Sequence, residues 1–135
     1  MTALPELPCA CMSARRLARI LTRLYAEEMV GHMEPAQFGL LQMMEHMPLC
    51  TQAGLAHALC MDKTTVSRDI AVMKKRGWVE GGRGGLRVTP IGRRLLADTM
   101  PHWQRAQKRL RKALGDDGWQ ALFAAMRAVS YEASA

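Results

Sequence analysis

The chain has 135 residues, of which 49% are hydrophobic, and carries a formal net charge of +7. This length predicts one domain with a modest core and is short for an enzyme with a buried cleft. No stretch approaches the roughly 20 apolar residues of a membrane span, and the N-terminus lacks the basic start and apolar core of a signal peptide. We therefore expect a cytoplasmic protein without a membrane segment, whose four cysteines are free thiols.

The N-terminal half of the chain is predicted to be helical. Residues 1–8 contain two prolines and should form an irregular arm, and a long amphipathic helix follows over about 13–29. Pro35, at a first-turn position, opens a second helix, which Pro48 ends. Thr51 is a good N-cap for a short third helix.

Residues 61–94 are the most informative part of the chain. Asp62 is a good N-cap and Gly77 a good stop for a helix between them. One apolar stripe along this helix consists of Val66, Ile70 and Met73. Hydroxyl and cationic side chains occupy much of the remaining surface. A helix docked by one stripe, with such side chains elsewhere, suits insertion into the major groove of DNA.

A glycine-rich hairpin follows that helix. Residues 78–80 and 86–88 alternate like paired strands, and the GGRGG run at 81–85 can adopt the positive φ angles of a tight wing. The hairpin carries Arg83 and Arg87. Residues 61–94 hold nine Lys or Arg against three acids, so +6 of the net charge lies there. Charge concentrated in this way indicates a polyanionic partner, although a solvated basic face is the simpler alternative.

The C-terminal part is again predicted to be helical. Thr89 caps a long helix, and Pro101 should kink or break it near residues 98–100. The sequence GDDG at 115–118 should be a helix–helix turn before a last helix.

Together these elements predict a mainly α fold with a small β-hairpin, a winged helix-turn-helix with N- and C-terminal dimerisation helices. We expect a single domain over 1–135, with a DNA-binding lobe at about 35–90. The helices at about 11–30 and 90–131 carry apolar stripes that a monomer would leave partly uncovered. A two-fold dimer would cover them and place two recognition helices in successive major grooves. In the alternative, these helices pack on their own domain.

Four segments resemble the MarR family of bacterial winged-helix transcription regulators. They are RRLARILTRLY, EPAQFGLLQMM, LAHALCMDKTTVSRDIAVMKKRGWVE and LRVTPIGRRLL. The resemblance covers nearly the whole chain. It implies a homodimer without a cofactor that binds a pseudo-palindromic operator. Such a protein is usually a repressor released by a small ligand or by thiol oxidation.

The resemblance also assigns DNA-binding residues. Base-reading positions fall on Lys63, Thr64, Thr65, Ser67 and Arg68. Thr51 and Gln52 match phosphate-contacting positions, and Arg83 and Arg87 match the wing arginine that enters the minor groove. Independently, Arg68 is long enough for bidentate guanine contact. The sequence departs from the family in the wing, which is short and lacks the usual Asp before the arginine.

Cys9-Ala10-Cys11 is a candidate thiol sensor. Two thiols at this spacing can bind a soft metal or arsenic(III), or respond to oxidants, and they can equally be inert. No CxxC, HxxxH or HExxH spacing supports a metal site. By position alone, Tyr25 and His32 are candidates for lining the family's ligand pocket.

Two other classes of function compete with a DNA-binding regulator. The chain could be a winged-helix protein-interaction module without specific DNA binding, although its basic helix argues against this. An enzyme is the weakest reading, because no Ser-His-Asp set, paired-carboxylate spacing or phosphate-binding loop stands out. The GGRGG run lies within a hairpin rather than between a strand and a helix.

Overall fold

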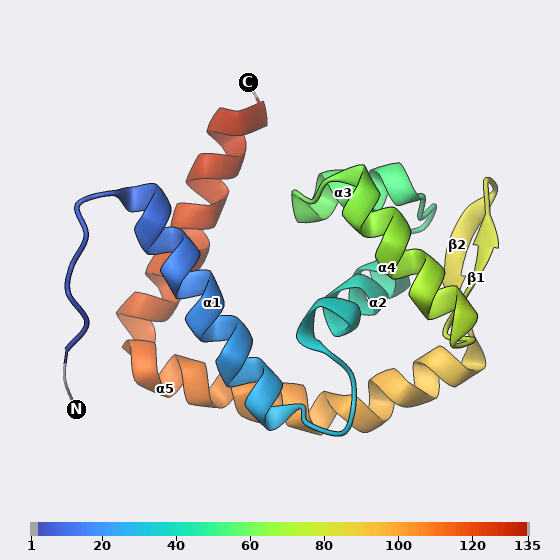
Figure 1. Cartoon of the computed structure of the whole chain (residues 1–135), viewed down its shortest axis with the longest axis horizontal. Coiled ribbons are helices and arrows are strands. Elements are labelled where there is room, and N and C mark those ends of the chain that lie inside the picture. Colours follow the sequence, from blue (N-terminus) through green and yellow to red (C-terminus); the bar gives the residue numbers. More distant parts are fainter. Residues whose placement is uncertain (1–2, 135) are drawn as a thin grey trace. The chain divides into compact units, whose positions relative to one another are not determined.

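The computed structural model describes residues 3–134 (Figure 1). In chain order its elements are α1 (Ala10–Glu28), α2 (Pro35–His46), α3 (Gln52–Leu59), α4 (Lys63–Lys75), β1 (Val79–Gly82), β2 (Gly85–Val88) and α5 (Pro90–Ser134). The predicted mainly helical fold with one hairpin is confirmed. The chain forms two compact units. The first, the winged-helix unit, comprises residues 29–102, and the second, the terminal unit, comprises the segments before and after it. Within the described residues, no helix combines the length and apolarity needed to cross a bilayer.

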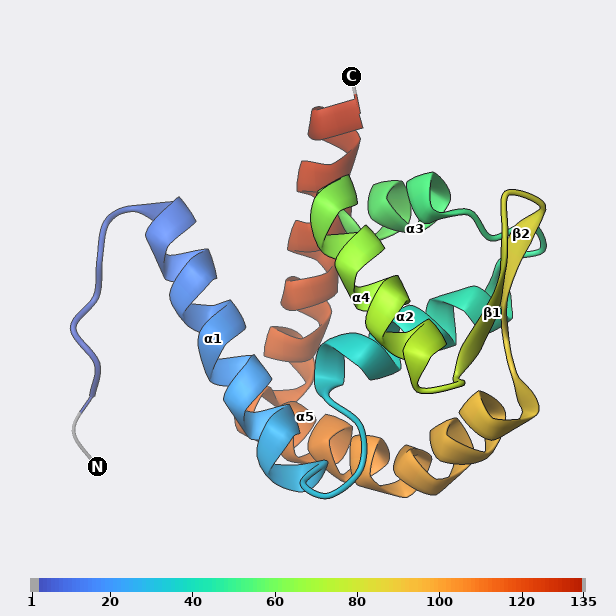
Figure 2. The ribbon, with the colours of Figure 1, turned by 45° about the vertical axis from the view of Figure 1, so that its right-hand side comes forward.

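The winged-helix unit has a continuous apolar core. α2, α3 and α4 pack with the hairpin, which follows α4 in Figure 2. The predicted stripe of α4 is buried, because Val66, Ile70 and Met73 are each at most 1% exposed. Their partners in the core are Phe38, Leu40, Leu41, Met44, Leu55, Ala56, Val79, Leu86 and Val88. Burial of so many large side chains is the main source of this unit's stability.

Side-chain caps fix the start of the two helices of the helix-turn-helix, as predicted. The Oγ1 of Thr51 accepts a hydrogen bond from the amide of Gly54 at 2.9 Å. The Oδ1 of Asp62 accepts one from the amide of Thr65 at 2.7 Å. Each bond satisfies an amide that the helix itself cannot pair. Between the helices, Cys60 takes a left-handed conformation with φ 53°.

The wing is more regular than predicted. The antiparallel strands pair from Val79↔Val88 to Gly82↔Gly85, so only two residues form the turn instead of the five expected. Glycines are generally poor in strands, yet here they extend the ladder. Gly81 has φ 100°, and a Cβ there would collide with the carbonyl oxygen of Gly85. The glycines therefore permit the close pairing of the strands at the tip.

Hydrogen bonds anchor the wing both near its turn and at its base. The amide of Leu86 donates to the carbonyl of Cys50 at 2.6 Å, which ties β2 to the residue before Thr51. Thr89 caps α5, as predicted, because its Oγ1 accepts from the amide of Gly92 at 3.1 Å. The same hydroxyl donates to the carbonyl of Gly77 at 2.5 Å. The two ends of the hairpin are thus joined beside the end of α4.

Of the kink or break predicted near residues 98–100, the break is wrong, because α5 continues through Pro101. Among the described residues of α5, Gly115 alone has non-helical dihedrals, with φ 74° and ψ 171°. Proline fixes φ near the helical value and removes one hydrogen bond, so a long helix can continue through it. The predicted helix–helix turn at 115–118 is confirmed, and it is concentrated at its first residue.

The terminal unit contrasts with the winged-helix unit in burial. α1 begins earlier than predicted, at Ala10, and contains no buried residue. Polar contacts join it to α5. The Tyr25 hydroxyl donates to Oε1 of Gln107, and Arg109 pairs with Glu27 at 2.7 Å. Large apolar side chains remain exposed on both helices: Leu17, Ile20, Phe123, Met126 and Val129.

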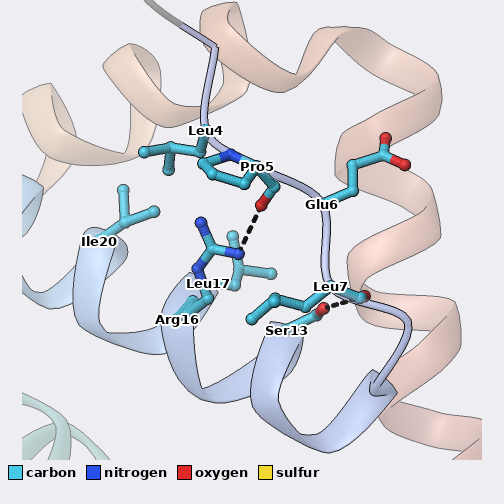
Figure 3. A pocket seen from close by; sticks show the side chains of 8 residues that line it. All are labelled: Leu4, Pro5, Glu6, Leu7, Ser13, Arg16, Leu17 and Ile20. Carbon is cyan, nitrogen blue, oxygen red and sulfur yellow. Dashed lines mark hydrogen bonds between the residues drawn. The ribbon is translucent and has the colours of Figure 1, made fainter.

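The N-terminal arm lies along α1 without regular secondary structure (Figure 3). Nη1 of Arg16 donates to the carbonyl of Pro5 at 2.8 Å, and Oγ of Ser13 donates to the carbonyl of Leu7 at 3.3 Å. The groove between arm and helix has a volume of about 420 Å³. Its lining combines these residues with Leu4, Glu6, Leu17 and Ile20. The predicted irregular arm is confirmed for its described residues.

Candidate nucleic-acid interface

Two hollows that share Gln52 lie on the surface of the winged-helix unit. The recognition hollow, of about 580 Å³, is lined by Gln52, Lys63, Thr64, Ser67, Arg68 and Ala71. The wing cleft, of about 360 Å³, is lined by Thr51, Gln52, Gly82, Arg83 and Leu86. The structure thus brings together seven of the nine residues predicted to bind DNA, and it leaves out Thr65 and Arg87.

The buried stripe of α4 determines which side chains reach the recognition hollow. Because that stripe faces the core, the residues on the next faces point outward. Lys63, Ser67 and Ala71 recur every four residues, as do Thr64 and Arg68, so they share one exposed side of the helix. Ala71 was not predicted, although its position four residues after Ser67 is the signal that identifies it. Its small side chain leaves room between its neighbours.

The chemistry of these hollows favours an anion. Their lining residues include three cationic side chains, on Lys63, Arg68 and Arg83, and no carboxylate. The nearby carboxylate of Asp62 is engaged by Thr65. Those hydrogen bonds lower the pKa of Asp62, and attraction to Arg68 lowers it further. A nucleic-acid backbone is bound by cationic side chains together with hydroxyl or amide donors, and this surface carries both.

Thr65 acts within the fold. It is half-buried, and both its amide and its hydroxyl donate to the Asp62 carboxylate, the hydroxyl at 3.0 Å. The sequence could have indicated this role. Thr65 is three residues after the N-cap Asp62, and the amide at that position is the usual donor to an N-cap side chain. The resemblance alone places Thr65 among the base readers.

Arg87 also has a partner within the fold. Its Nε lies 3.0 Å from Oε1 of Glu80, its cross-strand neighbour on β1. Both side chains are more than half exposed, so this ion pair contributes little stability, on the order of 0–1 kcal/mol. It nevertheless orients Arg87 along the hairpin, while Arg83 lines the wing cleft from the turn.

The candidate sensor thiols lie at the start of α1. Cys9 and Cys11 are both exposed, and Sγ of Cys9 accepts a hydrogen bond from the amide of Met12 at 3.5 Å. Cys50 is buried, and burial raises the pKa of its thiol. Within residues 3–134, no group of three His, Cys, Asp or Glu side chains is arranged to hold a metal ion.

The two candidate pocket residues belong to different units. Tyr25 is in the terminal unit, where burial raises the pKa of its hydroxyl. His32 is in the winged-helix unit, and its ring centroid lies 3.8 Å from that of His102. Each side chain therefore has a described partner within its own unit.

Known proteins share this fold. The MarR family model matches residues 33–95, which run from α2 into α5. The Mycobacterium tuberculosis transcriptional regulator MosR has a similar structure, with 26% identity, a TM-score of 0.82 and coverage of 94% of this chain and 96% of that one. No match was found among curated proteins.

Two further structures show the fold at lower identity. One is MosR in complex with DNA, with 24% identity, a TM-score of 0.79 and coverage of 93% and 98% of the two chains. The other is the transcriptional repressor CouR bound to p-coumaroyl-CoA, with 21% identity, a TM-score of 0.80 and coverage of 90% and 91%.

The chain is thus a winged helix-turn-helix protein. Its residues 33–95 match the MarR family, and that family and the structural neighbours are transcription regulators rather than enzymes. The resemblance predicted from the four sequence segments is confirmed.

Proposed function

We propose that this chain is a DNA-binding transcriptional regulator of the bacterial cytoplasm, a homodimeric repressor of a pseudo-palindromic operator. The observation that carries the proposal is the pair of adjoining hollows. They join the exposed side of α4 to the start of α3 and the wing, with cations and no carboxylate among their lining residues. MosR, which shares the fold, is bound to DNA in one of its structures.

Within this interface, α4 reads base edges in the major groove. Lys63, Thr64, Ser67 and Arg68 are its readers, and Arg68 contacts guanine through two parallel hydrogen bonds. Thr51 and Gln52 hold the DNA backbone. Thr65 orients the start of α4 through Asp62, and Arg87 orients the wing through Glu80.

The proposed homodimer uses the terminal unit. Its exposed apolar side chains, from Leu17 at 37% to Val129 at 68%, need a partner surface. A second copy of the same helices supplies one under two-fold symmetry. The helices at about 11–30 and 90–131 are therefore the dimerisation part of one functional domain, and the lobe at about 35–90 binds DNA.

The releasing signal is proposed to be a small ligand or a thiol reaction. CouR, a repressor of the same fold, is bound to an acyl-CoA, and Tyr25 and His32 are the candidate ligand contacts here. A disulfide between Cys9 and Cys11 would hold their sulfurs about 2.0 Å apart. It would withdraw Cys9 from the amide of Met12 and disturb the first turn of α1. Arsenic(III) binding by both thiols would act at the same place.

Thiol signalling is tested by measuring operator affinity before and after treatment with peroxide or arsenite. We expect the wild-type protein to lose affinity at least several-fold and the Cys9→Ser/Cys11→Ser protein to keep it. Equal affinity of the wild-type protein in every state would leave the small ligand as the signal.

The function itself is tested by selecting duplexes from random DNA with the purified protein. We expect recovered sites with two inverted half-sites one helical turn apart, and binding that weakens steeply with salt. Arg68→Ala should weaken specific binding by about 1–3 kcal/mol and relax selectivity at one position. Recovery of no preferred site, with salt-independent binding, would favour the protein-interaction module instead.

A further inference from the structure

The wing cleft is a rigid feature of the winged-helix unit. Its walls are the start of α3 and the turn of the hairpin. These walls are tied together, because the amide of Leu86 donates to the carbonyl of Cys50 at 2.6 Å, next to Thr51. Leu86, only 6% exposed, forms its apolar floor. The cleft is therefore shaped before any ligand enters.

Donors of three kinds line this cleft. The Oγ1 of Thr51 already accepts from Gly54, so its own proton is available for donation. The side chain of Gln52 has an amide with two donor hydrogens, and that of Arg83 has a guanidinium with five. No carboxylate lines the cleft. A rigid hollow with these donors and no acid is suited to an anion with several acceptor oxygens, such as a phosphodiester.

Arg83 is available for that anion. Within the described residues, no ion pair involves Arg83, whereas the other wing arginine is paired with Glu80. The hairpin register explains this, since Glu80 lies opposite Arg87 and away from the turn. Arg83 thus brings an uncompensated charge to the cleft.

The placement of the Arg83 side chain assigns it to the cleft. Pairing continues to Gly82↔Gly85, so Arg83 lies in a two-residue turn. Its side chain lines the wing cleft beside Thr51 and Gln52 at the start of α3. A guanidinium that binds a phosphate in this cleft is not available to enter the minor groove.

We infer that the wing cleft binds one phosphate of the DNA backbone through Arg83, Thr51 and Gln52, and that Arg83 does not read the minor groove. This inference rests on the proposed DNA-binding function and changes the role that the family resemblance gives to Arg83. The wing then positions the protein on DNA without contributing base preference.

Salt dependence provides the first test. Each neutralised phosphate contributes about 0.9 to the slope of log affinity against log salt. Arg83→Ala should therefore lower the slope of a homodimer by about two, on a selected operator and on a mixed-sequence duplex alike. Arg83→Lys should retain most of the slope, because a phosphate accepts either cation. Arg87→Ala, the matched wing comparison, should lower the slope less than Arg83→Ala does, because Glu80 already neutralises the charge of Arg87.

A single-phosphate test locates the contact. Methylphosphonate groups, which are uncharged, replace one operator phosphate at a time. At one position in each half-site, the wild-type protein should lose about tenfold in affinity, whereas Arg83→Ala should lose clearly less there, because only Thr51 and Gln52 still contact that phosphate. If Arg83→Ala instead keeps the wild-type sensitivity at every phosphate and changes the preference between A·T and G·C pairs, Arg83 reads the minor groove and the inference is overturned.

The outcomes separate this inference from the proposed function. If Arg68→Ala weakens operator binding but Arg83→Ala changes neither the salt slope nor phosphate sensitivity, only the wing cleft is refuted. If the wild-type protein shows no salt-dependent duplex binding, both proposals fail. Thermal unfolding of Arg83→Ala should match the wild type, because Arg83 is exposed in the turn, so lost binding cannot be attributed to lost folding.

Discussion

The two units of this chain differ in where their apolar side chains lie. In the winged-helix unit, the stripes of α2, α3 and α4 face one another and are nearly inaccessible to water. In the terminal unit, α1 buries no residue, and apolar side chains of both helices remain exposed. The same amphipathic pattern in sequence therefore has two consequences. One unit is completed by its own residues, and in the proposed homodimer a second molecule completes the other.

A matched pair of isoleucine substitutions tests this difference most strongly. Ile70 is 1% exposed and Ile20 is 44% exposed. Ile70→Ala should destabilise the protein by about 2–4 kcal/mol at every protein concentration, because it leaves a cavity in the core. Ile20→Ala should cost less than about 1 kcal/mol in dilute protein and more in concentrated protein, where the dimer forms. Denaturant unfolding at two concentrations measures both. Equal, concentration-independent losses would remove the distinction between the units.

A charge placed on the exposed stripe should separate the dimer. Met126 is 55% exposed and lies on the stripe of the last helical segment, whereas Ala128 is exposed on its other side. Met126→Glu should shift the mass in light scattering from twice 15.0 kDa toward 15.0 kDa, because the carboxylate would be desolvated in the interface. Ala128→Glu is the control and should stay dimeric. A dimer that survives Met126→Glu unchanged must use another surface.

Acid should weaken the winged-helix unit through its N-cap. Hydrogen bonds from Thr65 lower the pKa of Asp62 in the folded protein. A carboxylate whose pKa is lower in the folded protein than in the unfolded chain stabilises the fold when the pH is above the unfolded pKa. This stabilisation is lost as the pH falls through the pKa of the folded protein, below about pH 4. Thermal unfolding should show wild type more stable than Asp62→Asn near neutral pH, with the difference shrinking in acid. If the difference in stability between wild type and Asp62→Asn is the same at every pH, then titration of Asp62 does not contribute to the loss of stability in acid.

A glycine at position 60, in the turn before α4, should stabilise the protein. Cys60 holds φ at 53°, a left-handed angle that favours glycine. Cys60→Gly should raise the unfolding free energy by about 0.5 kcal/mol, because relief of strain slightly exceeds the added freedom of the unfolded chain. Cys60→Ala, which keeps the strain, should be neutral. Destabilisation by glycine would show that the thiol makes a favourable contact.

Local features of the fold could be predicted from the sequence, whereas features that depend on pairing could not. The caps Thr51, Asp62 and Thr89 and the stripe of α4 were predicted correctly because each depends on residues within one or two turns. The wing was harder. A five-residue turn would place Glu80 opposite Leu86, and the observed two-residue turn places it opposite Arg87. One residue of register therefore decides whether Arg87 lies opposite Glu80.

The helix through Pro101 shows a different limit. A proline inside a helical pattern usually marks a kink or a break, but here α5 continues through Pro101. The helical dihedrals are interrupted at Gly115 instead. The gathering of residues predicted to contact DNA into two hollows around Gln52 could not be predicted either, because it depends on how α3, α4 and the hairpin pack. The residue types were visible in sequence, but their common surface was not.

The joined base of the hairpin has a consequence for how this protein can vary. The Thr89 amide donates to the carbonyl of Trp78 at 2.9 Å, while its hydroxyl holds Gly77 and the first turn of α5. Gly92 fits there because a Cβ would strike the Trp78 carbonyl oxygen. The end of α4 is thus linked to the start of α5 by hydrogen bonds that do not involve the strands of the wing. Insertions or deletions at the tip can lengthen or shorten the wing while leaving the placement of α4 intact.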